Sequence, residues 1–133
     1  MNENTTQRSV VLIDDSSFIL NKLDDYFTHH LGFRVLARGK DGEDAVRLYR
    51  EMQPDLITLD LILPNKSGID ALREILTLFP QARIIVISAI RGNAMLQCIQ
   101  LGARGYVEKP LVFHSNEFCT DFRETVEEAF AVE

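Results

Sequence analysis

Three acidic side chains and one lysine follow three separate strand-like segments of this chain, and together they could perform phosphoryl chemistry. The acids are Asp14, Asp15 and Asp60, and the lysine is Lys109. If they meet, two unit charges about 5 Å apart repel by roughly 3 kcal/mol at an effective dielectric constant near 20, so cations are needed. Lys109 can offset one charge, and the remaining acids and solvent oxygens suit Mg²⁺, which prefers octahedral oxygen ligands. We therefore predict a magnesium site at Asp14, Asp15 and Asp60.

Beside a bound cation, Asp60 has the surroundings of a nucleophile. A carboxylate that attacks a phosphoryl group becomes an acyl phosphate. The phosphoryl oxygens would be met by Mg²⁺, by the ammonium group of Lys109 and by the hydroxyl of Ser88, which follows another apolar run. These residue types predict a phosphoacceptor at Asp60 with Ser88 and Lys109 as its helpers.

These side chains need a scaffold that brings distant parts of the chain together. Apolar runs predict strands at 10–13, 56–59 and 84–87, and less regular, shorter patterns predict two more at 33–37 and 105–108. Apolar residues at helical spacing predict helices that begin near Ser16, Glu43, Gly68, Gly92 and Asn116. This alternation predicts an α/β fold, a doubly wound parallel sheet with helices on both faces. In such sheets reactive groups gather at the carboxyl ends of the strands, so the polar residues should converge there.

The composition is that of one ordinary globular domain. With 133 residues, 46% of them hydrophobic and 26% charged, we expect a polar tail at 1–9 and a single domain at 10–133. The net charge of −6 disfavours nucleic-acid and anionic-membrane partners. Because the sequence shows neither a secretory signal nor a membrane-spanning run, we expect a cytoplasmic location. Cys98 and Cys119 lack metal-binding spacing and are expected to be buried free thiols.

The polar residues carry a resemblance that spans nearly the whole chain, from Val10 to about Phe130. Four motifs occur in the order typical of a response-regulator receiver domain. They are a pair of acids, a later aspartate followed by proline and glycine, a hydroxyl residue before alanine, and a lysine before proline. In this chain they are Asp14-Asp15, Asp60 with Pro64 and Gly68, Ser88-Ala89, and Lys109-Pro110. The sequence resembles in particular a stand-alone receiver of the chemotaxis type.

This resemblance has consequences for the fold and for the acceptor. It implies a flavodoxin-like sheet with strand order 2-1-3-4-5 and a cis peptide bond at Lys109-Pro110. It also implies that a histidine kinase phosphorylates Asp60, with Mg²⁺ held by Asp15, by Asp60 and, through water, by Asp14. Phosphorylation adds a charge of about −2 at the acceptor, and the protein would respond by changing between two conformations of its surface.

The resemblance further implies a switch made of Ser88 and Tyr106. The hydroxyl residue moves towards the new phosphoryl group, and the aromatic residue turns inward behind it. Taken alone, Tyr106 is more often plain core. Asp14 and Asp15 could equally cap the first helix, and Ser88 could cap the helix that follows it.

We expect a single-domain response regulator of two-component signalling that acts by docking to a separate target in chemotaxis or motility. It is not an enzyme in the usual sense, although it catalyses its own phosphoryl transfer. The expected partners are a histidine kinase, a downstream protein such as a flagellar motor switch, and a phosphatase, and the expected state is a monomer or weak dimer. Because the sequence ends with its fifth helix, docking is expected through the part from Gly92 onward. A phosphorelay intermediate or phosphate sink is the alternative.

Functions of other classes fit the same residues less well. An aspartyl-nucleophile phosphatase needs a second acid two residues after the nucleophile, where this chain has Ile62. A flavin carrier needs a phosphate loop after the first strand, where Asp14 and Asp15 would repel phosphate. His29 and His30, near a helix end, are expected to be solvated.

Two isoleucines near the acceptor suggest how long a phosphoryl group persists. Ile62 lies two residues after Asp60, and Ile90 lies two residues after Ser88. Some receivers carry an acid or an amide at these positions, and those groups help water to attack the acyl phosphate. The aliphatic side chains therefore predict slow self-dephosphorylation.

Overall fold

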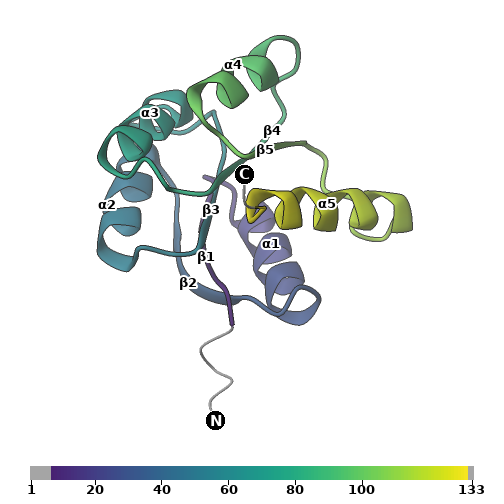
Figure 1. Ribbon diagram of the computed structural model, residues 1–133. Helices are drawn as coiled ribbons and strands as arrows, with labels where there is room; N and C mark the ends of the chain where they lie inside the picture. The colour runs from purple at the N-terminus through teal and green to yellow at the C-terminus, as the bar shows by residue number, and fades with distance from the viewer. Residues whose placement is uncertain (1–6, 132–133) are drawn as a thin grey trace.

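The computed structural model describes residues 7–131, which form five parallel strands alternating with five helices (Figure 1). The strands are β1 (Ser9–Ile13), β2 (Arg34–Gly39), β3 (Leu56–Leu59), β4 (Ile84–Ser88) and β5 (Gly105–Glu108). The helices are α1 (Ser17–His29), α2 (Gly42–Met52), α3 (Gly68–Leu78), α4 (Ala94–Leu101) and α5 (Asn116–Ala129). The sheet order is β2-β1-β3-β4-β5, so the predicted doubly wound, flavodoxin-like fold is confirmed. Most of the predicted tail at 1–9 lies outside the described residues.

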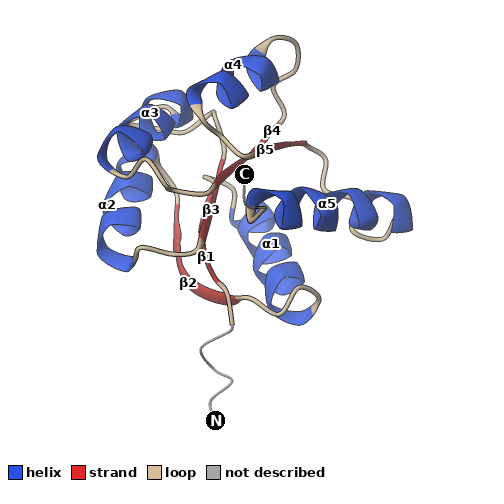
Figure 2. Cartoon of the chain, viewed as in Figure 1, coloured by secondary structure: helices blue, strands red, loops and turns tan. Residues whose placement is uncertain are grey.

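The sheet lies between two layers of helices (Figure 2). Helices α1 and α5 cover one face, and α2, α3 and α4 cover the other. Strands β1, β3 and β4 are buried along their whole length, as expected for parallel strands covered on both faces. Alternate residues enter different cores: Val11 and Ile13 pack towards α2 and α3, whereas Val10 and Leu12 pack towards α1 and α5. The residues that follow these strands therefore emerge together at one edge of the sheet.

Side-chain caps fix where four of the described helices begin. In each, an oxygen of the capping side chain accepts a hydrogen bond from the backbone amide three residues later, which pairs an otherwise free donor. The caps are Ser16 for α1, Asp41 for α2, Ser67 for α3 and Ser115 for α5.

Several element boundaries differ from the sequence prediction. Helix α4 begins at Ala94 because Gly92 has a φ of +83°, a left-handed conformation that a right-handed helix cannot include. Strand β2 occupies 34–39 instead of 33–37, and Phe33 precedes it with its ring packed edge-on against Phe27 at a centroid distance of 5.1 Å. Strand β1 begins one residue early, at Ser9.

The hydroxyl of Thr58 in β3 is buried and has no hydrogen-bond partner within residues 7–131. Thr58→Val replaces this hydroxyl with a methyl group of similar size. We expect the free energy of unfolding to rise by about 1 kcal/mol, because an unpaired buried polar group no longer has to be desolvated. Guanidinium denaturation measures the change, with the exposed Thr120→Val on α5 as the control. A less stable Thr58→Val protein would contradict the prediction.

The histidine and cysteine predictions hold in most respects. His29 and His30 are exposed at the end of α1, and the ring of His30 stacks on Tyr26 with 4.8 Å between centroids. Both cysteines are free. Cys98 is buried as predicted, whereas Cys119 is only half-buried and its thiol donates to the carbonyl of Phe113. Within residues 7–131, none of the helices combines the length and apolar character needed to cross a membrane.

Candidate phosphoacceptor site

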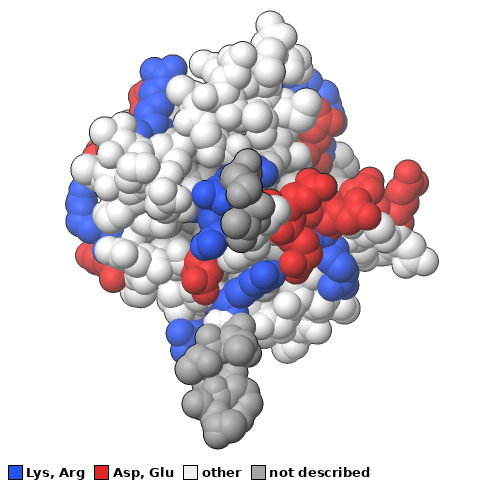
Figure 3. Space-filling model, viewed as in Figure 1, with Lys and Arg blue, Asp and Glu red and all other residues white. Residues whose placement is uncertain are grey.

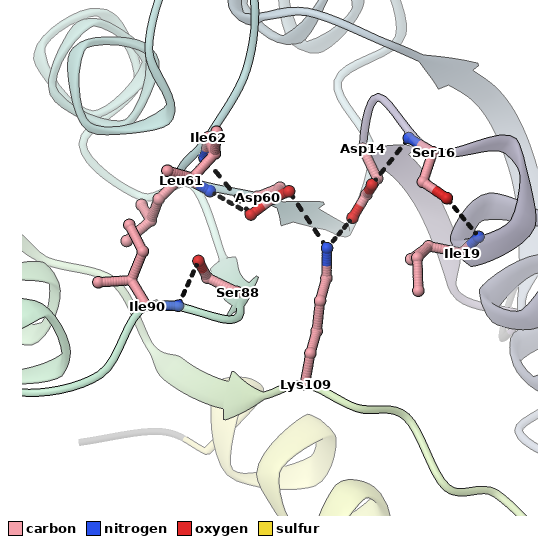
Figure 4. Close-up of polar contacts among 9 residues, drawn as sticks. All are labelled: Asp14, Ser16, Ile19, Asp60, Leu61, Ile62, Ser88, Ile90 and Lys109. Atoms are coloured by element: carbon pink, nitrogen blue, oxygen red, sulfur yellow. Dashed lines mark hydrogen bonds and ion pairs between the residues drawn. The ribbon is translucent and has the colours of Figure 1, made fainter.

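Three strand ends bring Lys109, Asp14 and Asp60 into direct contact (Figure 4). The Nζ atom of Lys109, after β5, lies 2.8 Å from Oδ2 of Asp14 and 3.2 Å from Oδ2 of Asp60. These carboxylates follow β1 and β3 and are only 1% and 5% exposed. Since a buried carboxylate is costly unless it is paired, the ammonium group between them stabilises both. The predicted convergence of these three residues is confirmed, as is the cis peptide bond at Lys109-Pro110.

Backbone amides hold the other oxygen of Asp60. Its Oδ1 atom accepts hydrogen bonds from the amide of Leu61 at 2.7 Å and, more weakly, from that of Ile62 at 3.4 Å. The loop then folds back, and the amide of Gly68 donates to the carbonyl of Leu61 at 2.9 Å. A Cβ atom at Gly68 would lie 2.1 Å from the carbonyl oxygen of Asp60, so this close return requires glycine.

Asp15 completes an acidic cluster at the same edge of the sheet. One carboxylate oxygen from each of Asp14, Asp15 and Asp60 lies within 4.8 Å of the others, with Asp15 exposed to solvent. Neither Asp14 nor Asp15 caps α1, because Ser16 does so through the amide of Ile19, and that alternative is wrong. The Oδ1 atom of Asp14 instead accepts from the amide of Ser16. Two buried carboxylates beside one that is exposed to solvent fit Mg²⁺, which keeps several water ligands.

The electrostatics of Asp14 and Lys109 reflect competition between burial and pairing. Burial raises the pKa of the Asp14 carboxyl above its ordinary value, although the hydrogen bonds from Lys109 and from the amide of Ser16 act in the opposite direction. Burial alone would lower the pKa of Lys109, but the hydrogen bonds and charges of Asp14 and Asp60 outweigh it and raise that pKa. The lysine is therefore cationic at neutral pH.

Ser88 and Tyr106 both contact the backbone of Ile90. The Oγ atom of Ser88 accepts a hydrogen bond from the amide of Ile90 at 3.2 Å, and the hydroxyl of Tyr106 donates to the carbonyl of Ile90 at 2.7 Å. Ser88 does not cap α4, because the capping position is Asn93. The shared contact with Ile90 cannot be recognised from residue types, since any residue supplies the same backbone groups.

A groove of about 390 Å³ lies between α4, β5 and α5, apart from the carboxylate cluster. Its lining includes Met95, Tyr106, Glu108, Phe118, Asp121 and Thr125. Beside it, α4 exposes the apolar side chains of Met95, Leu96 and Ile99. Acidic side chains gather over α5 (Figure 3). This surface combines apolar contact area with acidic residues.

Comparison with known proteins identifies the family. The family described as the response regulator receiver domain matches residues 10–120. The chemotaxis protein CheY of Thermotoga maritima is 38% identical over 104 residues, which cover 77% of this chain and 86% of that protein. CheY of Bacillus subtilis is 38% identical over 102 residues, which cover 76% and 84%.

Solved structures agree with the sequence comparison. A chain in the crystal structure of the CheX-CheY-BeF3-Mg²⁺ complex from Borrelia burgdorferi has a TM-score of 0.87 and 30% identity, covering 99% of this chain and 96% of that one. The response regulator domain of Thermotoga maritima CheB has a TM-score of 0.80 and 27% identity. This chain therefore belongs to the response regulator receiver family, as a CheY-like receiver domain.

Proposed function

We propose that this receiver takes a phosphoryl group onto Asp60 from a histidine kinase, in a reaction that requires Mg²⁺. The observation that carries the proposal is the position of Lys109, whose ammonium group contacts Asp14 and Asp60 while Asp15 lies beside both. This arrangement concentrates a nucleophile, a fixed cation and oxygen ligands for a metal ion at one edge of the sheet.

The chain's own residues account for the transfer step. A carboxylate oxygen of Asp60 forms a bond to phosphorus while the phosphorus–nitrogen bond of the donor phosphohistidine breaks and the imidazole keeps the electron pair. The amides of Leu61 and Ile62 orient the carboxylate, and Lys109 offsets charge on the phosphoryl oxygens. Mg²⁺ held by Asp14, Asp15 and Asp60 would supply further charge compensation for those oxygens. The product is an acyl phosphate on Asp60.

Ser88 and Tyr106 are proposed to report the phosphorylated state. Both contact Ile90, so a hydroxyl of Ser88 that turns towards a phosphoryl group gives up its bond with the Ile90 amide. The loop after β4 can then move, and the hydroxyl of Tyr106, which is bonded to the carbonyl of the same residue, moves with it. The two contacts with Ile90 thus connect the acceptor to the groove between α4 and α5, because Tyr106 lines that groove.

The output is proposed to be docking to a separate protein through α4, β5 and α5. The groove and the exposed apolar side chains of α4 offer the contact area. The Borrelia burgdorferi neighbour was crystallised in a complex of CheY with CheX, which supports partner binding by chains of this kind. A chemotaxis or motility target, such as a flagellar motor switch, and a phosphatase remain our expected partners. A phosphorelay intermediate or phosphate sink is the second candidate.

The proposed function is tested with a small phosphodonor. We expect acetyl phosphate to add the mass of one phosphoryl group when Mg²⁺ is present and none when it is chelated. The absence of any increment with Mg²⁺ would contradict the proposal. An increment that does not depend on Mg²⁺ would contradict the assigned metal site.

The aliphatic residues beside the acceptor predict a long-lived phosphoryl group. Ile62 is 63% exposed and Ile90 is half-buried, and neither can position water for attack. We expect the double variant Ile62→Asn with Ile90→Glu to shorten the phosphoryl half-life by about tenfold, because polar groups there can orient a water molecule. Loss of the phosphoryl mass over time measures the decay, with Ile99→Asn on α4 as the matched control. Equal half-lives in the double variant and wild type would contradict this explanation.

A further inference from the structure

The loop that follows Asp60, residues 61–67, carries the groups that orient the phosphoacceptor, and we call it the acceptor loop. Its first two amides, those of Leu61 and Ile62, donate to Oδ1 of Asp60. No side chain in the described residues donates to this oxygen. The direction of the Asp60 carboxylate therefore depends on the path of the backbone in this loop.

The far part of the loop is anchored to the beginning of α2. The Nδ2 atom of Asn65 donates to Oδ2 of Asp41 at 2.6 Å, and the amide of Gly42 contacts the carbonyl of Pro64 at 3.5 Å. A Cβ atom at Gly42 would lie 1.9 Å from the carbonyl oxygen of Lys66, so the two backbones touch at this glycine. Asn65 itself has a φ of +67°, a left-handed conformation that asparagine tolerates better than most residues.

Asp41 uses its two carboxylate oxygens for two different elements. Oδ1 accepts from the amide of Asp44 at 2.7 Å and so caps α2. Oδ2 accepts from Asn65 in the acceptor loop. Capping alone needs only one oxygen, and a serine or threonine can supply it. The second oxygen has a separate partner that lies five residues after the acceptor.

We propose that Asp41 is a positioning residue for phosphorylation: through Asn65 it holds the loop whose amides orient the Asp60 carboxylate. A hydrogen bond to a charged group is about twice as strong as a neutral one, so Asp41 can restrain the loop although Asn65 is exposed. The inference rests on the proposed function, because it concerns the same acceptor. Asp41 does not contact the reacting atoms and acts only through the loop.

Two single variants separate this role from helix capping. Asp41→Ser keeps a capping oxygen for α2 but is too short to reach Asn65, and Asn65→Gly keeps the left-handed backbone but removes the donor. With acetyl phosphate and saturating Mg²⁺, we expect each to lower the rate constant of phosphorylation by about tenfold, the factor that corresponds to one charge-assisted hydrogen bond. The double variant should be no slower than the slower single variant, because both substitutions break the same contact.

The matched control is Ser115→Ala, which removes the cap of α5 without touching the acceptor loop. It should lower stability while leaving the phosphorylation rate constant within about twofold of wild type. Amide NMR adds a second measurement, because a general loss of stability does not change the chemical shifts of the folded protein. The amide resonances of Leu61 and Ile62 should shift in Asp41→Ser and in Asn65→Gly, and should stay in place in Ser115→Ala.

The possible outcomes distinguish this inference from the proposed function. Wild-type rate constants in Asp41→Ser and Asn65→Gly, or additive losses in the double variant, would overturn the positioning role while phosphorylation of Asp60 stands. If wild type takes up no phosphoryl group, the proposed function fails, and the NMR spectra alone then decide whether Asp41 holds the loop. Unchanged Leu61 and Ile62 resonances in both variants would overturn the inference in either case.

Discussion

Asp60→Asn is expected to abolish phosphoryl incorporation from acetyl phosphate, with a loss of at least about a hundredfold in rate, because an amide cannot form the acyl phosphate. Asparagine has nearly the same shape as aspartate, so its oxygen can still accept from the amides of Leu61 and Ile62. The variant should therefore remain folded. Intact-protein mass spectrometry after incubation with Mg²⁺ and the phosphodonor measures the effect.

The control for this experiment is Asp24→Asn, which alters an aspartate on α1 that pairs with Arg38 away from the site. It should take up one phosphoryl group like wild type. A phosphoryl increment that persists in Asp60→Asn would show that another residue is the acceptor, and it would contradict the assignment.

Lys109→Met is expected to have the largest effect on stability of the substitutions considered. It keeps the aliphatic volume but leaves Asp14 and Asp60 buried together without their ammonium partner. We expect the free energy of unfolding to fall by about 3 kcal/mol in the absence of divalent ions, which is typical when one member of a buried ion pair is removed. Urea denaturation in the presence of a chelator measures the loss.

Mg²⁺ offers a second test of the same charge balance. If Lys109 and a metal ion both offset the carboxylates, saturating Mg²⁺ should stabilise Lys109→Met by binding to its folded state. The matched control is Lys22→Met, whose Nζ donates to a single backbone carbonyl, that of Leu111, and which should lose no more than about 1 kcal/mol. Equal stability losses in the two variants would contradict the bridging role of Lys109.

The sequence was sufficient to predict that the polar residues at the strand ends lie close together. Asp14, Asp60 and Lys109 each come directly after a strand, and parallel strands present their carboxyl ends at one edge. Their proximity follows from the topology of the sheet, so the order of strands and helices in the sequence is enough to predict it. The same argument predicts that Asp15 and Ser88 lie near this edge.

Other features depend on contacts that residue types do not reveal. The anchoring of the acceptor loop by Asp41 and Asn65 joins residues 24 positions apart through the conformation of a loop. In the sequence, Lys40-Asp41-Gly42 is typical of a turn, and the residues around Asp41 do not indicate that it also binds a distant loop. The predicted start of α4 near Gly92 is wrong because the residue types do not reveal that Gly92 adopts a left-handed conformation in the loop before the helix. Loop geometry, which depends on tertiary contacts, limits what the sequence can predict.

The most direct measurement is to locate the phosphoryl group on the chain. After incubation with acetyl phosphate and Mg²⁺, borohydride reduction converts an acyl phosphate of aspartate into homoserine, which peptide mass spectrometry identifies. We predict that this conversion occurs at Asp60 alone and disappears when Mg²⁺ is chelated. Conversion at another aspartate, or a phosphoryl group that borohydride does not remove, would contradict the assignment of Asp60 as the phosphoacceptor.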